Sequence, residues 1–271
     1  MTTAVGVCRV DDGSFALLDT AFPDIGAVIE QEGSLAGLAG CRVRDRLDPA
    51  TTPLLAPLGR PRAIWGVGLN YHSKAATTGR AVPSEPILYL AASSSMVPPD
   101  AQLCIPVEQT SELDYEAEIA VIIGRRLYQA DAGQVWAAVA VITAANDVTA
   151  RDVMRRTATP VLANSFPGCA PLGASVLGAE EIADRDSIGV RSWVNGELRQ
   201  DDRSSGLIFS IPDLLARISW FSALEPGDVV LTGTPTGTGQ DRGIWLAPGD
   251  TVRIEVDGVL PLVTHVVAPT P

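Results

Sequence analysis

Residues 113–124 narrow the possible folds of this chain more than any other segment. Positions 113, 115, 117, 119, 121 and 123 are all apolar, whereas Asp114, Glu116 and Glu118 occupy the first three even positions. Side chains of a β-strand alternate between the two faces of a sheet, so this period of two predicts a strand with one face in the core. Long stretches of helical periodicity are scarce elsewhere, and strands and helices do not alternate regularly. The sequence therefore predicts a β-rich α+β fold and not a doubly wound parallel sheet.

Turn residues divide the rest of the chain into short elements. Residues 5–10 and 15–18 flank Asp-Asp-Gly, a pattern typical of a β-hairpin. The segment 25–38 is predicted to form a helix, although two glycines weaken it. Helical spacing of apolar residues also predicts helices over 130–140 and 212–224.

Prolines recur every fourth residue between positions 49 and 61. Proline fixes φ and lacks an N–H, so this spacing is typical of a tether between two units. We predict a small N-terminal β-rich domain over residues 1–58 and a catalytic domain over residues 59–271.

Charge and hydropathy exclude several classes of partner. The 271 residues include 20 Lys and Arg against 32 Asp and Glu, a formal charge of −12, and Lys74 is the single lysine. Nucleic-acid and anionic membrane surfaces need clustered cations, so neither partner is expected. The longest apolar run, 135–145, is far shorter than the roughly 20 residues that span a bilayer, and no targeting segment is visible. Four scattered cysteines without a Cys-x-x-Cys pair indicate a reducing, cytoplasmic compartment.

The carboxylates of the alternating segment suggest a cation site. Glu116 and Glu118 are predicted to project from one strand face, roughly 6.5–7 Å apart. Two such charges repel unless a cation lies between them, and Mg²⁺, Mn²⁺ and Ca²⁺ all prefer oxygen ligands. The alternative is a solvated acidic face on a half-buried strand. Asp147, which follows the apolar run, is either a third carboxylate of the site or a strand-end cap, and Arg151 with Asp152 is predicted to form a local charge pair.

Five stretches, taken together, resemble the fumarylacetoacetate hydrolase superfamily. They occur in the family's order across residues 62–262. The stretches are GVGLNY at 66–71, LDYEAE at 113–118, NDVTARD at 146–152, VNGELRQ at 194–200 and the Pro- and Gly-rich segment 224–239.

The resemblance implies a mixed, mostly β-sheet folded as a roll and commonly assembled as a homodimer. It implies a divalent metal, usually Mg²⁺, held by Glu116, Glu118 and Asp147. It also implies a small-molecule substrate, a 2-oxo acid or 1,3-dicarbonyl compound, and a reaction that is C–C hydrolysis, decarboxylation or keto–enol isomerisation. Each of these reactions builds negative charge on a carbonyl oxygen, which a bound metal stabilises as a Lewis acid.

The chain departs from the family pattern at the residues that usually activate water. Lys74 stands where the family keeps a histidine, and Thr77 stands where it keeps an acid. The Tyr-Leu-Ala at 89–91 replaces a Phe-Leu-Lys, and Asn164 replaces a second lysine. Attack of water on a carbonyl needs a positioned base, so these departures favour enolate chemistry over hydrolysis.

The remaining candidates surround this predicted centre. Lys74 is predicted to act as a proton donor or as a clamp for a substrate anion, and His72 is the alternative as a base displaced by two residues. The Gly-rich loop 233–239 is predicted to bring backbone N–H groups to a substrate carboxylate. The side chains predicted to contact substrate are Tyr71, Asn164, Gln200 and the hydroxyl of Thr234.

Three functions follow from these residues. The first is a divalent-metal enzyme that works through a stabilised enolate, with C–C cleavage, decarboxylation or isomerisation as its reaction and a place in specialised metabolism. The second is an acylpyruvate-type hydrolase with His72 as its base. The third is a catalytically silent family member that keeps the metal for stability or ligand binding.

Overall fold

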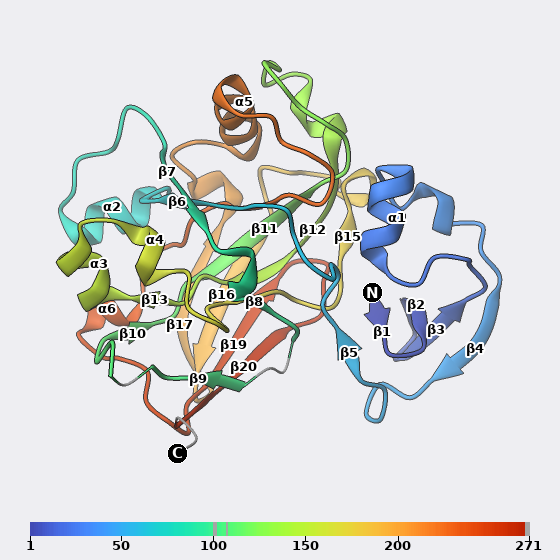
Figure 1. The fold of residues 1–271 in the computed structure, drawn as a ribbon, viewed down its shortest axis with the longest axis horizontal. Helices are drawn as coiled ribbons and strands as arrows, with labels where there is room; N and C mark the ends of the chain where they lie inside the picture. The colour runs from blue at the N-terminus through green and yellow to red at the C-terminus, as the bar shows by residue number, and fades with distance from the viewer. Residues whose placement is uncertain (100–101, 107, 269–271) are drawn as a thin grey trace.

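The structure, a computed structural model, describes residues 1–99, 102–106 and 108–268. It has the mixed, mostly β architecture that the sequence predicts, with two large sheets in the main body and a third sheet near the N-terminus (Figure 1). The last three residues of the predicted catalytic domain lie outside the described residues.

Five strands near the N-terminus form a sheet of their own in the order β4-β3-β2-β1-β5. The predicted hairpin is confirmed as β2 and β3, which pair from Cys8 with Leu17 to Asp11 with Ser14. The boundary between residues 58 and 59 stays our proposal for the division into domains. The strand bounds are β1 Thr2–Thr3, β2 Gly6–Asp11, β3 Ser14–Leu18, β4 Val43–Leu47 and β5 Leu54–Leu55.

The helix predicted over 25–38 is wrong in its second half. Helix α1 covers Ile25–Glu32 and begins at Asp24, whose carboxylate accepts a backbone hydrogen bond of the first turn. It stops at Gly33, whose φ of 70° is the left-handed conformation that glycine adopts at low cost. A short 3₁₀ turn, Ala36–Leu38, takes the place of the remainder.

A six-stranded sheet forms the centre of the molecule in the order β15-β12-β11-β18-β6-β7. Neighbouring strands are antiparallel except β18 and β6, which run parallel. The strand bounds are β6 Ile64–Gly68, β7 Ile87–Ala91, β11 Ala117–Ile123, β12 Val139–Asn146, β15 Leu177–Gly178 and β18 Val229–Leu231.

A second, five-stranded sheet packs against one face of the central sheet, in the order β17-β16-β19-β20-β9. Two short ladders, β10 with β13 and β8 with β14, complete the strand pairing of the described residues. The bounds are β8 Met96–Val97, β9 Gln102–Cys104, β10 Leu113–Asp114, β13 Thr149–Ala150, β14 Ala170–Pro171, β16 Gly189–Val194, β17 Glu197–Arg203, β19 Thr251–Val256 and β20 Leu262–Val267.

Strand β11 is buried on both faces, which differs from the predicted half-buried strand. Ile119 and Val121 belong to the core between the two large sheets. Ala120 and Ile122 belong to a second core, which the central sheet shares with α1 of the N-terminal unit. A strand covered on both faces reads as a continuous apolar run, as residues 119–123 do. The interpretation of a solvated acidic face is therefore wrong.

Of the other two predicted helices, one is wrong and one is confirmed. In the segment 130–140 a short 3₁₀ turn, Val135–Ala138, leads directly into β12. Pairing with β11 and burial of β-branched side chains outweigh the local helical spacing there. The helix predicted over 212–224 is confirmed as α5, Ile211–Phe221.

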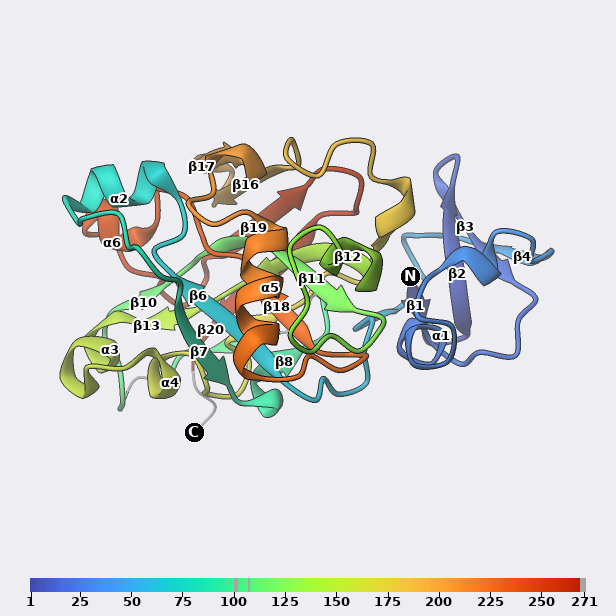
Figure 2. The same ribbon diagram turned by 90° about the horizontal axis from the view of Figure 1, so that it is seen from above.

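Four short helices gather at the end of the molecule that lies away from the N-terminal sheet (Figures 1 and 2). Residues from this end, together with the start of β11, surround a cavity. Within the described residues, no helix is long and apolar enough to cross a membrane. The helix bounds are α2 His72–Thr78, α3 Arg151–Thr157, α4 Pro160–Ala163 and α6 Gly239–Arg242, and further 3₁₀ turns cover Ser93–Ser95, Ala179–Glu181 and Ser204–Gly206.

Candidate metal centre

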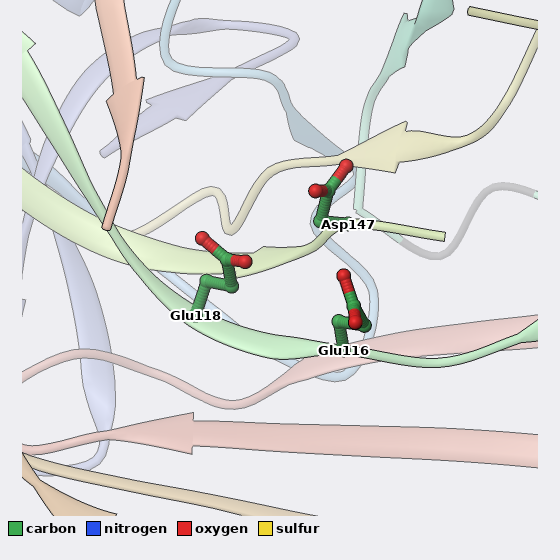
Figure 3. A group of neighbouring side chains, drawn as sticks. All are labelled: Glu116, Glu118 and Asp147. Carbon is green, nitrogen blue, oxygen red and sulfur yellow. The ribbon is translucent and has the colours of Figure 1, made fainter. Parts of the chain in front are cut away.

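The register between β11 and β12 brings three carboxylates together. Ala117 pairs with Asn146, so Glu116, which precedes the first strand, and Asp147, which follows the second, lie side by side beyond the ladder. The backbone N–H of Asp147 donates to the carbonyl of Glu116 over 3.0 Å. Glu118 lies beside them, and the three side chains form one group (Figure 3). One carboxylate oxygen from each residue lies within 4.8 Å of the others.

Burial makes this grouping electrostatically costly. The exposed fractions of Glu116, Glu118 and Asp147 are 8%, 1% and 1%. Burial, followed by the charges of Asp147 and Glu116, raises the pKa of Glu118 well above its usual range. Burial and the charge of Glu116 raise the pKa of Asp147 to about 7. The fold therefore holds three carboxylates together against their own repulsion.

Arg151 is the cation that faces the cluster. Its Nε donates to Asp114 over 2.8 Å, and its Nη2 donates to Glu116. The predicted local pair of Arg151 with Asp152 is wrong, because Asp152 instead accepts a hydrogen bond from the Thr110 hydroxyl. One guanidinium faces four neighbouring carboxyl groups and can offset only one negative charge, so ionisation of the remaining groups has no compensating cation within this cluster.

Asp147 has a hydrogen-bond donor on each of its oxygens. The Tyr89 hydroxyl donates to Oδ2, and Nδ2 of Asn164 donates to Oδ1 over 3.0 Å. The same Nδ2 of Asn164 also donates to the hydroxyl of Thr149 over 2.7 Å. These bonds lower the pKa of Asp147, but less than burial and the charge of Glu116 raise it.

Two members of the cluster, Glu116 and Glu118, line a cavity of about 710 Å³. Residues from α2, from the segment around α3 and α4 and from the Gly-rich loop also line it. They include two arginines outside the cluster, Arg80 and Arg155, and Arg155 is paired with Glu112. The predicted site residues among the described lining residues are Lys74, Glu116, Glu118, Asn164 and Thr234.

Lys74 reaches this cavity with its charge already paired. The ammonium donates to the Thr238 hydroxyl over 2.6 Å and to Oδ1 of Asp241 over 2.8 Å. Oδ2 of Asp241 accepts from the backbone N–H of Gly237 over 2.8 Å. Burial opposes the charge of Asp241, but these hydrogen bonds and the lysine charge lower the pKa of its carboxyl. The pair ties α2 to α6 beside the metal centre.

Backbone N–H groups of the Gly-rich loop donate hydrogen bonds to the protein's own carboxylates and are not free to bind a ligand. The N–H of Gly233 donates to Glu118 over 2.7 Å, and the N–H of Gly239 donates to Asp114 over 2.6 Å. The Thr234 hydroxyl donates to the carbonyl of Ala117 over 3.0 Å. The prediction that these N–H groups bind a substrate carboxylate is therefore wrong for this arrangement, and the loop instead holds the start of β11.

Besides Asp147, three candidates lie apart from the described lining of the cavity. His72 is exposed at the start of α2, and Tyr71 before it is fully buried. Gln200 is buried, accepts from the N–H of Ala117 over 3.0 Å and donates to the Thr234 hydroxyl over 2.8 Å. Gln200 therefore supports the segment that carries the two clustered glutamates.

The residues present fit a hard divalent cation. The donor set consists of carboxylate oxygens, which Mg²⁺, Mn²⁺ and Ca²⁺ prefer. Buried charges of one sign are held together at low cost only when an opposite charge offsets them. Glu116, Glu118 and Asp147 would hold the cation, and the excess negative charge beside Arg151 provides the electrostatic reason for binding it.

Some functional residues carry little signal in the sequence. Asp114 belongs to the same alternation as Glu116, and that pattern could have placed it at the site. Tyr89 lies on β7 and reaches Asp147 only through the order of the sheet. Asp241 meets Lys74 across 167 residues, so no local spacing links them.

Comparison with known proteins gives a consistent family assignment. Residues 63–267 match the family described as fumarylacetoacetate (FAA) hydrolase C-terminal. The rat protein named oxaloacetate tautomerase Fahd2a, mitochondrial, is 38% identical over 216 residues, which are 79% of this chain and 69% of the rat protein.

Two solved structures share the fold. The 5-carboxymethyl-2-hydroxymuconate delta-isomerase of Mycobacterium smegmatis has a TM-score of 0.77 and 27% identity, covering 97% of this chain and 94% of the isomerase. The fumarylpyruvate hydrolase of Pseudomonas aeruginosa, solved with Mn²⁺ and pyruvate, has a TM-score of 0.70 and 28% identity, covering 77% of this chain and 91% of the hydrolase. The similar proteins thus include a tautomerase, an isomerase and a hydrolase.

Proposed function

This chain is an enzyme of the fumarylacetoacetate hydrolase superfamily, and we propose that it converts a small 2-oxo acid or 1,3-dicarbonyl substrate through an enolate, with Mg²⁺ as its metal. The reaction we propose is keto–enol isomerisation or decarboxylation, not hydrolysis of a C–C bond. One observation carries this choice: neither of the chain's two histidines belongs to the described lining of the cavity that holds the carboxylate cluster.

The position of the two histidines matters because hydrolysis needs a base that activates water. His72 and His265 are both exposed, and Lys74 occupies the position of the family histidine with its ammonium paired to Asp241. An ammonium cannot accept a proton from water, so the chain lacks the usual way of activating one. Enolate formation requires less: a stabilised oxyanion and a group that moves one proton.

Some of the residues hold the metal, and others balance charge or hold the groups around it. Glu116, Glu118 and Asp147 hold the metal, which supplies Lewis-acid stabilisation of an oxyanion when it is bound. Arg151 orients Glu116 by a direct hydrogen bond. Lys74, whose ammonium is paired with Asp241, holds α2 against α6 at the cavity wall.

The similar proteins support oxaloacetate as the first substrate to test. The rat relative is named an oxaloacetate tautomerase, and the Pseudomonas hydrolase was solved with pyruvate and Mn²⁺. Both compounds are 2-oxo acids, and the cavity lining adds Arg80 as a cation for a second carboxylate. A homodimer and a cytoplasmic location remain part of the proposal.

The decisive experiment follows keto–enol conversion and decarboxylation of oxaloacetate in parallel with hydrolysis of an acylpyruvate. We expect metal-dependent enolate chemistry that EDTA abolishes and that Mg²⁺ restores. Hydrolysis of the acylpyruvate that disappears in His72→Ala while metal binding is kept would overturn the proposal in favour of the hydrolase. A metal-induced rise in melting temperature without turnover of any 2-oxo acid would show a silent member.

A further inference from the structure

The tyrosine of β7 adds a hydroxyl to the metal centre where the family pattern has a phenylalanine. Tyr89 is 9% exposed, and its hydroxyl donates to Oδ2 of Asp147. We infer that Tyr89 is a positioning residue, which fixes the orientation of Asp147 as a metal ligand, and that Gly66 makes this position available to its ring. This inference rests on the proposed function only in requiring that the cluster binds a divalent cation.

Gly66 is directly opposite Tyr89 in the ladder of β6 and β7. A Cβ added at residue 66 would lie 2.2 Å from Cζ of the tyrosine ring and 2.5 Å from its hydroxyl oxygen. Those distances are far below van der Waals contact, so the ring occupies the volume that any larger residue would fill. The backbone of Gly66 has an ordinary negative φ, and its missing side chain is what the ring requires.

Asn164 completes the arrangement from the opposite side of the carboxylate. Its Nδ2 donates to Oδ1 of Asp147, while the tyrosine hydroxyl donates to Oδ2. Two donors on two oxygens prevent the carboxylate group from rotating, so its remaining lone pairs keep one direction. Thr149 accepts from the same Nδ2 and fixes the amide in turn.

The chemistry of both donors suits a ligand that must stay anionic toward the metal. A hydroxyl and an amide orient a carboxylate without cancelling its charge, whereas the lysine of the family pattern at position 164 would have brought a competing cation. Partners of metal ligands commonly change metal affinity by about 10–100-fold. The chain thus combines departures from the family pattern at Tyr89 and Asn164 in the support of one ligand.

The experiment measures Mg²⁺ and Mn²⁺ affinity by calorimetric titration of the full chain. We expect Tyr89→Phe to bind each ion about tenfold more weakly, with a melting temperature of the metal-free protein close to that of the wild type. Tyr128→Phe is the matched control, because Tyr128 is 51% exposed and its hydroxyl lies outside the cavity lining. The control should bind both ions like the wild type.

Gly66→Ala tests the same inference without removing any polar atom of the site. It should weaken metal binding like Tyr89→Phe, and the double variant should bind no more weakly than the weaker single variant, because the hydroxyl can be lost only once. Gly59→Ala is its control, since a Cβ there meets nothing within 4 Å.

The outcomes separate the inference from the proposed function. Wild-type metal affinity in Tyr89→Phe, with the wild-type protein binding metal, overturns the positioning role alone. Additive losses in the double variant overturn the link between Gly66 and the hydroxyl. A wild-type protein that binds neither ion overturns the metal centre itself, and the positioning role falls with it.

Discussion

Both ends of strand β11 are buried, but burial has opposite effects on the free energy at the two ends. Around its start, the even positions are Glu116, which directly precedes the strand, and Glu118, and both line the cavity. Four residues further on, the even positions are Ala120 and Ile122, which pack against the N-terminal unit. The odd positions of both halves enter one core between the sheets.

The difference lies in what covers each half of that face. Apolar side chains of α1 cover the second half, so burial there releases the free energy of removing apolar surface from water. Carboxylates, one guanidinium and a cavity cover the first half, so burial there raises free energy until a cation enters. One strand thus carries both the stability of the fold and the strain of its site.

Glu118→Ala should have the largest effect. Loss of a metal ligand should lower turnover by about 1000-fold and abolish measurable binding of Mg²⁺, because no neighbouring carboxylate replaces it. The metal-free variant should be at least as stable as the wild type, since one repelling charge is gone. Turnover and calorimetric titration check this, with exposed Glu30→Ala as the control; wild-type turnover and affinity would refute the metal centre.

Ile122→Ala, on the same strand face, should lower stability and leave metal binding unchanged. The cavity left against the N-terminal unit should lower the free energy of unfolding by about 3 kcal/mol, while metal affinity of the folded protein stays unchanged. Denaturant unfolding and metal titration measure the two effects. Ile244→Ala is the control, because Ile244 is 57% exposed. Lost metal affinity in Ile122→Ala would break the distinction between the halves.

Lys74→Met tests a third situation, a buried charge that is compensated within the chain. Removing the ammonium leaves the carboxylate of Asp241 without its cation and should cost about 3 kcal/mol of unfolding free energy. Asp241→Asn should cost a similar amount, and the double variant should cost less than the sum of both. Thermal and denaturant unfolding supply these values. Additive losses would show that the two side chains act independently.

The pH dependence gives the smallest effect and tests the uncompensated charges directly. The pKa of Asp147, raised by burial and by Glu116, is about 7. A carboxyl with a raised pKa binds its proton more tightly in the folded state, so stability of the metal-free protein should fall as pH rises from about 4 through 7. The metal must displace this proton, so affinity should rise about tenfold from pH 6 to pH 8. A flat affinity profile by titration would contradict it.

Much of the fold could be predicted from the chain alone, whereas the set of three clustered carboxylates was expected only from the family resemblance. Alternation is a local property, so the strand over 113–123 was predictable, although the structure divides it into β10 and β11. The prediction of a helix over 130–140 failed because the partner strand of β12 comes from elsewhere in the chain. The helical spacing of apolar residues within a short window carries no information about a strand partner elsewhere in the chain.

The candidate site divides in the same way. Spacing left Glu116, Glu118 and Asp147 open between a cation site and a solvated strand face or strand-end cap, and the family resemblance joined them into one set. The partners of Asp147 and Lys74 could not be predicted, since Tyr89 and Asp241 reach them through sheet order and loop packing. The exposure of His72 could not be predicted either, because the turn into α2 decides which side chain faces the cavity.

The sequence by itself determined the alternation of apolar and acidic residues over 113–118 and which family residues are missing, because these depend on positions along the chain. Only the tertiary structure decided that the acids are buried, that a single arginine offsets them and that a tyrosine hydroxyl meets Asp147 across from Gly66. Those facts depend on distances between segments far apart in sequence, and electrostatic free energy depends on such distances and on burial.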